Sequence, residues 1–167
     1  LKPVLYLSPK GERILDFGQN AAGFVRVKLC ASRGTKVTLT HGEVLQNGWF
    51  YNANYRTAKA EATYISDGTE REAEPFFTYF GFRYVKVEGL DEVNPDDFTF
   101  VMLSSALEKT SDWHSDSEEI DRLVKNAYFG QLSNFLDVPT DCPQRDERLG
   151  WTADAQVFSR TACYQED

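Results

Sequence analysis

The first 105 residues alternate between apolar and polar positions in short runs that favour β-strands. In one run, Val25, Val27 and Leu29 share a face, and charged side chains occupy the other. Six runs rich in Val, Phe, Tyr and Thr occupy residues 13–18, 23–30, 36–43, 59–66, 82–89 and 98–105. Turn-forming clusters lie between them at residues 20–23, 32–35, 46–49 and 66–70. This spacing predicts an antiparallel β-sandwich with one face of each sheet in the core.

The period changes after residue 105, where apolar residues recur at helical spacing. Ser115 is the expected N-cap of a first helix, because Glu118 three residues later completes a capping box. Pro139 cannot continue a helix, so this helix should end near Leu136. Its apolar stripe consists of Ile120, Leu123, Val124, Ala127, Leu132 and Phe135.

A second helical pattern begins near Thr152 and is expected to run to the end of the chain. Its apolar stripe is formed by Ala155, Phe158 and Ala162. The two patterns together predict a mainly β chain in which a sandwich at residues 1–105 precedes a helical domain at residues 106–167.

Charge follows the same division. The formal net charge is −8, yet residues 1–105 carry 12 basic and 13 acidic side chains, whereas residues 106–167 carry 6 and 13. This acidity argues against nucleic acid or an anionic membrane as a partner. No apolar run approaches the length of a membrane span. The three cysteines, Cys30, Cys142 and Cys163, are too few and too scattered for a disulfide framework or a zinc site.

The acidity concentrates in one stretch, DVPTDCPQRDERLGWTADAQ at residues 137–156. Neighbouring carboxylates and the apolar ring of Trp151 favour a protonated Glu147, while Arg145 and Arg148 oppose this. A protonated carboxyl group suits a general acid, spare carboxylates accept hydrogen bonds from hydroxyls, and an aromatic ring offers a flat wall. This combination suggests a sugar site.

Two other interpretations of this stretch remain open on composition alone. One is a structural loop between two helices, whose arginines neutralise its carboxylates. The other is a calcium site formed by Asp141, Asp146 and Asp154. The stretch lacks the regular oxygen spacing and the central glycine of an EF-hand, so we expect no metal and no cofactor.

The stretch FLDVPTDCPQRDERLGWTADAQ closely resembles the signature of bacterial α-L-rhamnosidases of glycoside hydrolase family 78. The segment HSDSEEIDRLVKNAYFGQLSNF is similar to the first helix of the family's (α/α)₆ barrel. Four earlier segments resemble the concanavalin-like β-sandwich that precedes the barrel in this family: DFGQNAAGFVRVKL, GTKVTLTHGEVL, NYRTAKAEATYISDG and FTYFGFRYVKVEG. The resemblance covers nearly the whole chain and implies a sandwich followed by the first helices of an incomplete barrel.

The resemblance also implies roles for individual residues. Glu147 matches the general acid, which protonates the oxygen of the leaving group. Asp141 and Asp154 match carboxylates that bind rhamnose hydroxyls, Arg145 matches a basic residue of the same pocket, and Trp151 matches an aromatic residue that packs on the sugar. Two positions depart from the family pattern: Ala153 replaces a usual glycine, and Phe80 replaces an expected histidine.

Family 78 enzymes invert the configuration of the sugar, which requires a second carboxylate to activate water. In the family this base is a glutamate much later in the barrel, so it should lie beyond Asp167, and this chain should be an inactive part of a longer enzyme. Its partners would be a rhamnose-containing glycoside, the remainder of the barrel and possible further copies of itself. The alternative is a non-catalytic carbohydrate-binding or structural β-sandwich with a helical tail. The particular rhamnoside, the compartment (cytoplasm, periplasm or secreted) and the oligomeric state stay open.

Overall fold

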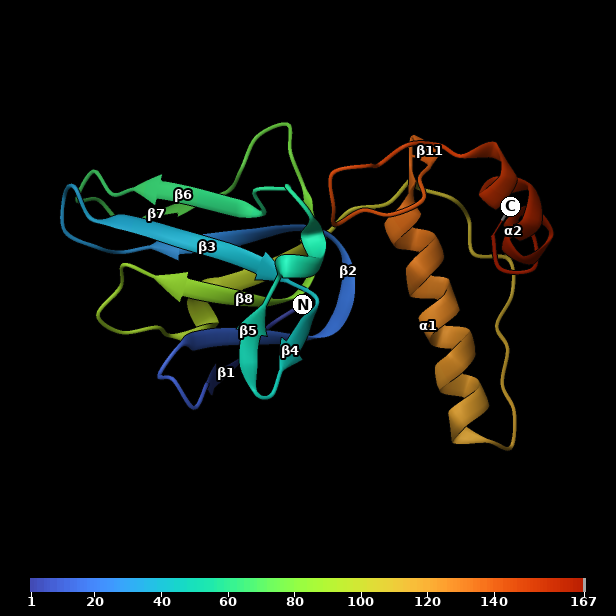
Figure 1. Cartoon of the computed structure of the whole chain (residues 1–167), viewed down its shortest axis with the longest axis horizontal. Coiled ribbons are helices and arrows are strands. Elements are labelled where there is room, and N and C mark those ends of the chain that lie inside the picture. Colours follow the sequence, from blue (N-terminus) through green and yellow to red (C-terminus); the bar gives the residue numbers. More distant parts are fainter. Residues whose placement is uncertain (167) are drawn as a thin grey trace.

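The computed structural model describes residues 1–166 and has a β-sheet part followed by a helical part (Figure 1). The strands of the main sheet are β1 (Val4–Leu7), β2 (Arg13–Leu29), β3 (Lys36–Gly42), β6 (Glu61–Ile65), β7 (Arg71–Ala73), β8 (Phe80–Glu88) and β9 (Phe98–Met102). A hairpin consists of β4 (Val44–Gln46) and β5 (Trp49–Tyr51), and two short 3₁₀ helices are η1 (Ala53–Tyr55) and η2 (Pro95–Asp97). The helical part contains α1 (Glu118–Asn134), β10 (Phe135–Leu136), β11 (Val138–Pro139) and α2 (Thr152–Ala162).

The long strand β2 joins the two layers of the sandwich. Its first half lies between β1 and β8 in the order β1-β2-β8-β3-β6, and its second half pairs with β9 and β7. All of these pairings are antiparallel. The register against β8 shifts between Asp16 and Ala21, which marks a β-bulge in β2.

The predicted fold class is confirmed, because the sheet is antiparallel and encloses its own core. Val25, Val27 and Leu29 are each 1% exposed, as their alternation predicts. Residues 20–23 were expected to form a turn, and this was wrong. They remain within β2, because the residues on both sides of the bulge pair with the same strand β8.

The helical part agrees with the sequence pattern except at its ends. Ser117, not Ser115, is the N-cap of α1 and accepts a hydrogen bond from the backbone N–H of Ile120. Ser115 instead binds the carboxylate of Asp121 through its N–H and its hydroxyl. The second helix ends at Ala162 and does not continue to the end of the chain.

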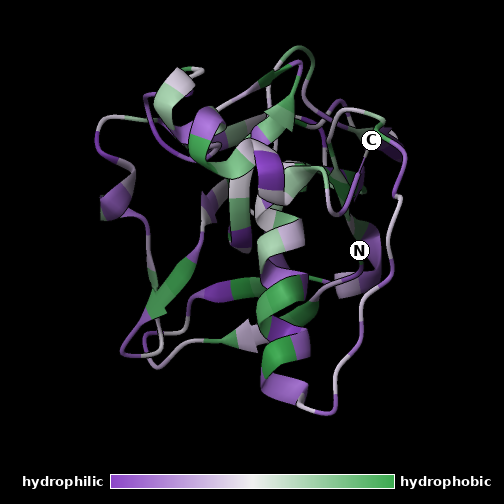
Figure 2. Cartoon of the chain, turned by 90° about the vertical axis from the view of Figure 1, so that its right-hand side faces the viewer, coloured by the Kyte–Doolittle hydropathy of each residue, from purple (hydrophilic) through white to green (hydrophobic). Residues whose placement is uncertain are grey.

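Two of the six residues in the predicted apolar stripe of α1 are exposed on the surface of this chain. Ile120 is 47% exposed and Leu123 is 67% exposed, and hydrophobic turns of α1 face the viewer in Figure 2. The buried residues of α1 are Gln131 and Ser133, near the end that contacts the sandwich. There, the Ser133 hydroxyl accepts a hydrogen bond from the backbone N–H of Ala22 in β2. Within residues 1–166, neither helix has the length and apolar character needed to cross a membrane.

Candidate active site

The acidic stretch forms a closed loop between α1 and α2. At one end, Thr140 donates a backbone hydrogen bond to the carbonyl of Asn134, in the last turn of α1. At the other, the backbone N–H of Asp141 donates to the carbonyl of Leu149, and the N–H of Leu149 donates to the Asp141 carboxylate. Residues 141 and 149 are thereby paired, and the residues between them turn toward the sandwich.

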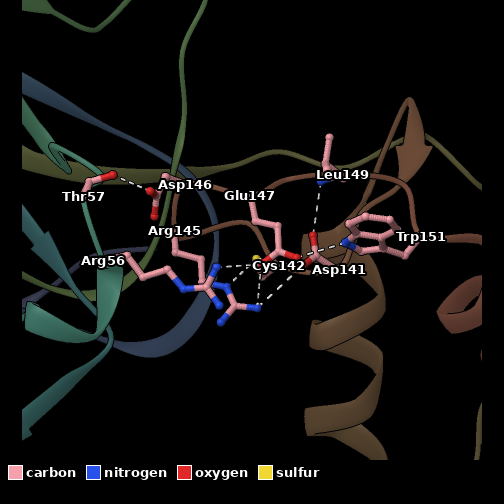
Figure 3. A network of polar contacts seen from close by, with 9 residues as sticks. All are labelled: Arg56, Thr57, Asp141, Cys142, Arg145, Asp146, Glu147, Leu149 and Trp151. Carbon is pink, nitrogen blue, oxygen red and sulfur yellow. Dashed lines mark hydrogen bonds and ion pairs between the residues drawn. The ribbon is translucent and has the colours of Figure 1, made fainter.

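Glu147 lies at the centre of a polar network within this loop (Figure 3). Its Oε2 is 2.9 Å from Arg145 and 3.0 Å from Arg56, both through guanidinium nitrogens. Its Oε1 accepts a hydrogen bond of 3.0 Å from the indole N–H of Trp151. The two carboxylate oxygens therefore face different partners: the arginines hold one, and the tryptophan holds the other.

Asp141, Cys142 and Arg145 form the inner side of the network. The Cys142 thiol donates to Asp141, and the Nε of Arg145 donates to the Cys142 sulfur at 3.1 Å. Burial acts to raise the pKa of Asp141, but hydrogen bonds from the Cys142 thiol and the Leu149 N–H outweigh it and lower this pKa below its ordinary value. Asp141 is thus an ionised acceptor at neutral pH.

Candidate metal ligands also meet here. One ligand atom each from Asp141, Cys142 and Glu147 lies within 4.8 Å of the other two. The guanidinium of Arg145 contacts all three side chains and supplies the positive charge at this point. The calcium set considered from the sequence is not brought together as a cluster, because Asp146 turns to the sandwich and Asp154 belongs to α2.

A cavity of about 220 Å³ lies between α1 and α2, beside this network. Asp141, Trp151 and Asp154 line it together, so the structure brings these three predicted sugar-binding residues to one place. Apolar groups complete the wall, among them Ala155 and Phe158 of α2. The cavity thus combines two carboxylates with an apolar side.

Two residues of the network come from the sandwich, and the sequence reasoning missed both. Arg56 and Thr57 follow η1 in the loop that leads to β6. Arg56 pairs with Glu147, and the Thr57 hydroxyl donates to Asp146 and lowers the pKa of that carboxyl group. About ninety positions separate the partners in sequence, and no local pattern marks them.

A second contact between the sandwich and the loop lies at the start of β8. Arg148 donates to the carbonyl of Tyr79 at 2.9 Å, and its guanidinium lies over the Tyr79 ring. Arg148 therefore contacts the sandwich rather than Glu147, contrary to the expectation from the sequence. Next to it, Gly81 touches the motif so closely that a Cβ atom there would lie 2.9 Å from the Cβ of Gln144.

The remaining sequence expectations concern Trp151, Phe80 and Ala153. Trp151 was expected to give Glu147 apolar cover, yet it turns its N–H edge to the carboxylate. Phe80 packs in the core, where it stacks on His41 with 4.0 Å between ring centroids. Ala153 is exposed in the first turn of α2.

Two family models match this chain, one for each part. Residues 7–104 match the bacterial alpha-L-rhamnosidase concanavalin-like domain, and residues 108–167 match the bacterial alpha-L-rhamnosidase 6 hairpin glycosidase domain. A curated alpha-L-rhamnosidase from Streptomyces avermitilis is 43% identical over 157 residues, which are 92% of this chain and 15% of that protein.

Solved structures give the same result. The native rhamnosidase from Aspergillus terreus superposes with a TM-score of 0.96 at 38% identity, over 99% of this chain and 20% of that chain. The Streptomyces avermitilis alpha-L-rhamnosidase complexed with L-rhamnose superposes with a TM-score of 0.95 at 40% identity, over 99% and 16%. The chain thus spans about a sixth to a fifth of the length of these relatives.

Proposed function

This chain belongs to the bacterial α-L-rhamnosidase family, and we propose that the complete protein hydrolyses α-L-rhamnosides and releases terminal rhamnose. The chain supplies a β-sandwich domain at residues 1–105 and the start of the catalytic (α/α)₆ domain at residues 106–167. The two family models support this division by their limits. Asp167, the last residue of this chain, lies outside the residues that the structure describes.

The observation that carries the proposal is the meeting of Glu147, Asp141 and Trp151 beside a cavity that Asp154 also lines. Rhamnose is a 6-deoxy sugar, so it presents ring hydroxyls together with a methyl group. The carboxylates of Asp141 and Asp154 suit the hydroxyls as acceptors, and the apolar wall with Phe158 suits the methyl group. Arg145 orients this pocket through its contacts with Asp141 and Glu147.

In the proposed reaction, Glu147 is the general acid. Its O–H bond breaks as the proton passes to the glycosidic oxygen, the bond from that oxygen to the anomeric carbon breaks, and the aglycone leaves as an alcohol. A water molecule attacks the anomeric carbon from the opposite face and inverts it, while a second carboxylate takes the proton of the water. We assign that base to the remainder of the barrel, beyond residue 167.

Replacing Glu147 by Gln in the complete protein tests this assignment. Glutamine keeps the shape but cannot give up the proton, so turnover of an alkyl rhamnoside should fall about 10²–10⁴-fold. Hydrolysis of 4-nitrophenyl α-L-rhamnoside should fall much less, because nitrophenolate leaves without protonation. Rhamnose binding, measured by calorimetry, should stay within a few-fold of wild type.

A matched control is Glu118→Gln, which changes an exposed carboxylate at the start of α1. This variant should keep wild-type kinetics on both substrates. Near wild-type turnover of the alkyl rhamnoside by Glu147→Gln would remove Glu147 as the acid. Rhamnose binding by the complete protein without hydrolysis of either substrate would favour the accessory carbohydrate-binding role. If the reaction inverts the anomeric carbon, NMR of the wild-type reaction should show β-rhamnose as the first product.

A further inference from the structure

The β-sandwich contacts the proposed general acid, Glu147, through the side chain of Arg56. Arg56 of the sandwich places a guanidinium nitrogen 3.0 Å from Oε2 of Glu147. The neighbouring Thr57 hydroxyl binds Asp146, the residue before Glu147. We propose that Arg56 is a positioning residue for the general acid, which holds Oε2 of Glu147 and turns Oε1 toward the sugar pocket. This inference rests on the proposed role of Glu147.

The loop that carries Arg56 is fixed on both sides. Before it, Tyr55 is 1% exposed and its hydroxyl donates to the carbonyl of Gly81 at 2.6 Å. After it, the carbonyl of Ala60 accepts from the backbone N–H of His41 at 2.8 Å. Between these anchors Arg56 has φ +59° and ψ −118°, in a region that a residue with a side chain rarely adopts. The surroundings therefore impose this conformation and direct the side chain at the motif.

Arg56 and Arg145 both contact Glu147, but they differ in their other contacts and in the part of the chain from which they come. Arg145 divides its guanidinium among Asp141, Cys142 and Glu147, and it belongs to the same loop as all three. Arg56 comes from another element and reaches Glu147 from the sandwich side (Figure 3). Arg56 thus ties the carboxylate of the acid to the sandwich, whereas Arg145 ties it to its own loop.

The division of the two oxygens defines the atom that carries the proton. Oε1 faces Trp151, which lines the cavity, and Oε2 is held by the two arginines. When the proton on Oε1 passes to the glycosidic oxygen, Glu147 becomes a carboxylate whose negative charge lies against both guanidinium groups. Arg56 therefore both directs Oε1 and stabilises the charge that proton donation leaves behind.

Kinetics of the complete protein separate positioning from a merely structural role. Arg56→Gln should lower kcat on methyl α-L-rhamnoside roughly ten- to hundred-fold, because a misplaced acid serves a poor leaving group badly. On 4-nitrophenyl α-L-rhamnoside the loss should be less than about three-fold, with KM unchanged, because this leaving group needs little protonation. Arg56→Lys, which keeps the charge, should restore part of the loss.

Two controls accompany these variants. Arg71→Gln removes another arginine of the sandwich that is similarly exposed and forms an ion pair with Asp67, and it should behave as wild type. In the Glu147→Gln background, Arg56→Gln should cause no further loss on the methyl rhamnoside, because the group on which it acts is gone. Equal losses on both substrates, or a full additional loss in that background, would overturn the proposal.

A readout without turnover keeps the inference independent of the proposed function. In this chain, the indole N–H resonance of Trp151, assigned with Trp151→Phe, reports the hydrogen bond to Oε1 of Glu147. Arg56→Gln should shift this resonance, and Arg71→Gln should not. A resonance that does not respond to Arg56→Gln refutes the positioning role. If the resonance shifts but the complete protein cleaves no rhamnoside, the result still supports the positioning of Glu147 by Arg56. It then contradicts the proposed role of Glu147 in rhamnoside hydrolysis.

Discussion

Acidification should destabilise this protein through His41, which anchors the loop that carries Arg56. The imidazole is 0% exposed and stacks on Phe80. Its Nδ1 lies 2.9 Å from the Ala60 carbonyl oxygen, which can only accept, so the neutral ring carries its proton on Nδ1. Within residues 1–166 the buried Nε2 has no partner. Burial therefore lowers the pKa of His41 from 6.5 to about 4.

The magnitude follows from the difference between the folded and unfolded pKa values. The unfolded chain protonates His41 near pH 6.5, whereas the folded protein resists protonation until about pH 4. The stabilisation from the neutral ring is thus complete above pH 6.5 and is lost as the pH falls from 6.5 toward 4. At pH 4.5 this loss amounts to about 2.5 kcal/mol relative to neutral pH, a large share of the stability of a small domain.

Urea unfolding at pH 7 and at pH 4.5, followed by circular dichroism, measures this loss. His41→Phe keeps an aromatic ring against Phe80 but cannot be protonated, so its unfolding free energy should fall about 2.5 kcal/mol less than that of wild type. His114→Asn is the comparison: this histidine is 91% exposed and pairs with Asp121, so its replacement should remove much less of the decrease on acidification than His41→Phe removes. Equal losses of unfolding free energy in wild type and His41→Phe, or a titration midpoint of His41 near 6.5 by NMR, would refute the role of the buried neutral ring.

Two further predictions concern the motif loop and the isolated chain. Gly81→Ala should displace Gln144, because the new Cβ would lie 2.9–3.0 Å from its Cβ, Cα and N, and overpacking of this kind costs about 1–3 kcal/mol. Rhamnosidase activity of the complete variant should fall, and unchanged activity at unchanged thermal stability would contradict the close contact. The purified 167-residue chain should release no rhamnose from 4-nitrophenyl α-L-rhamnoside, because we place the general base outside it. Turnover above about 1% of that of the complete protein would refute this.

Most of the sandwich could be predicted because its core follows local alternation. Val25, Val27 and Leu29 are buried as their period of two requires, because side chains of a strand alternate between two faces. The prediction of a turn at residues 20–23 was wrong, because small and turn-forming residues occur at a bulge as well as at a turn. Only the pairing with β8, about sixty positions away, distinguishes the two.

In the site as well, contacts between residues close in sequence could be predicted, and contacts between distant residues could not. Asp141, Glu147 and Trp151 lie within eleven positions, so one loop brings them together, and their residue types alone suggest sugar chemistry. The N-cap of α1 moved to Ser117 because Asp121 binds Ser115, a competition that a capping pattern does not reveal. Arg56 was missed because its partner is 91 positions away. Long-range docking has no local signature, and it decides which groups complete the site.

The close approach of Gly81 to Gln144 has a consequence for recombination between relatives. A crossover near residue 105 would exchange the whole sandwich and leave the motif at residues 137–156 intact, because the cut lies at the boundary between the two domains. It would nevertheless combine the surface around Arg56, Tyr79 and Gly81 of one parent with the loop at residues 141–149 of the other. Chimaeras that keep these two segments from the same parent should retain activity more often than chimaeras cut at the domain boundary.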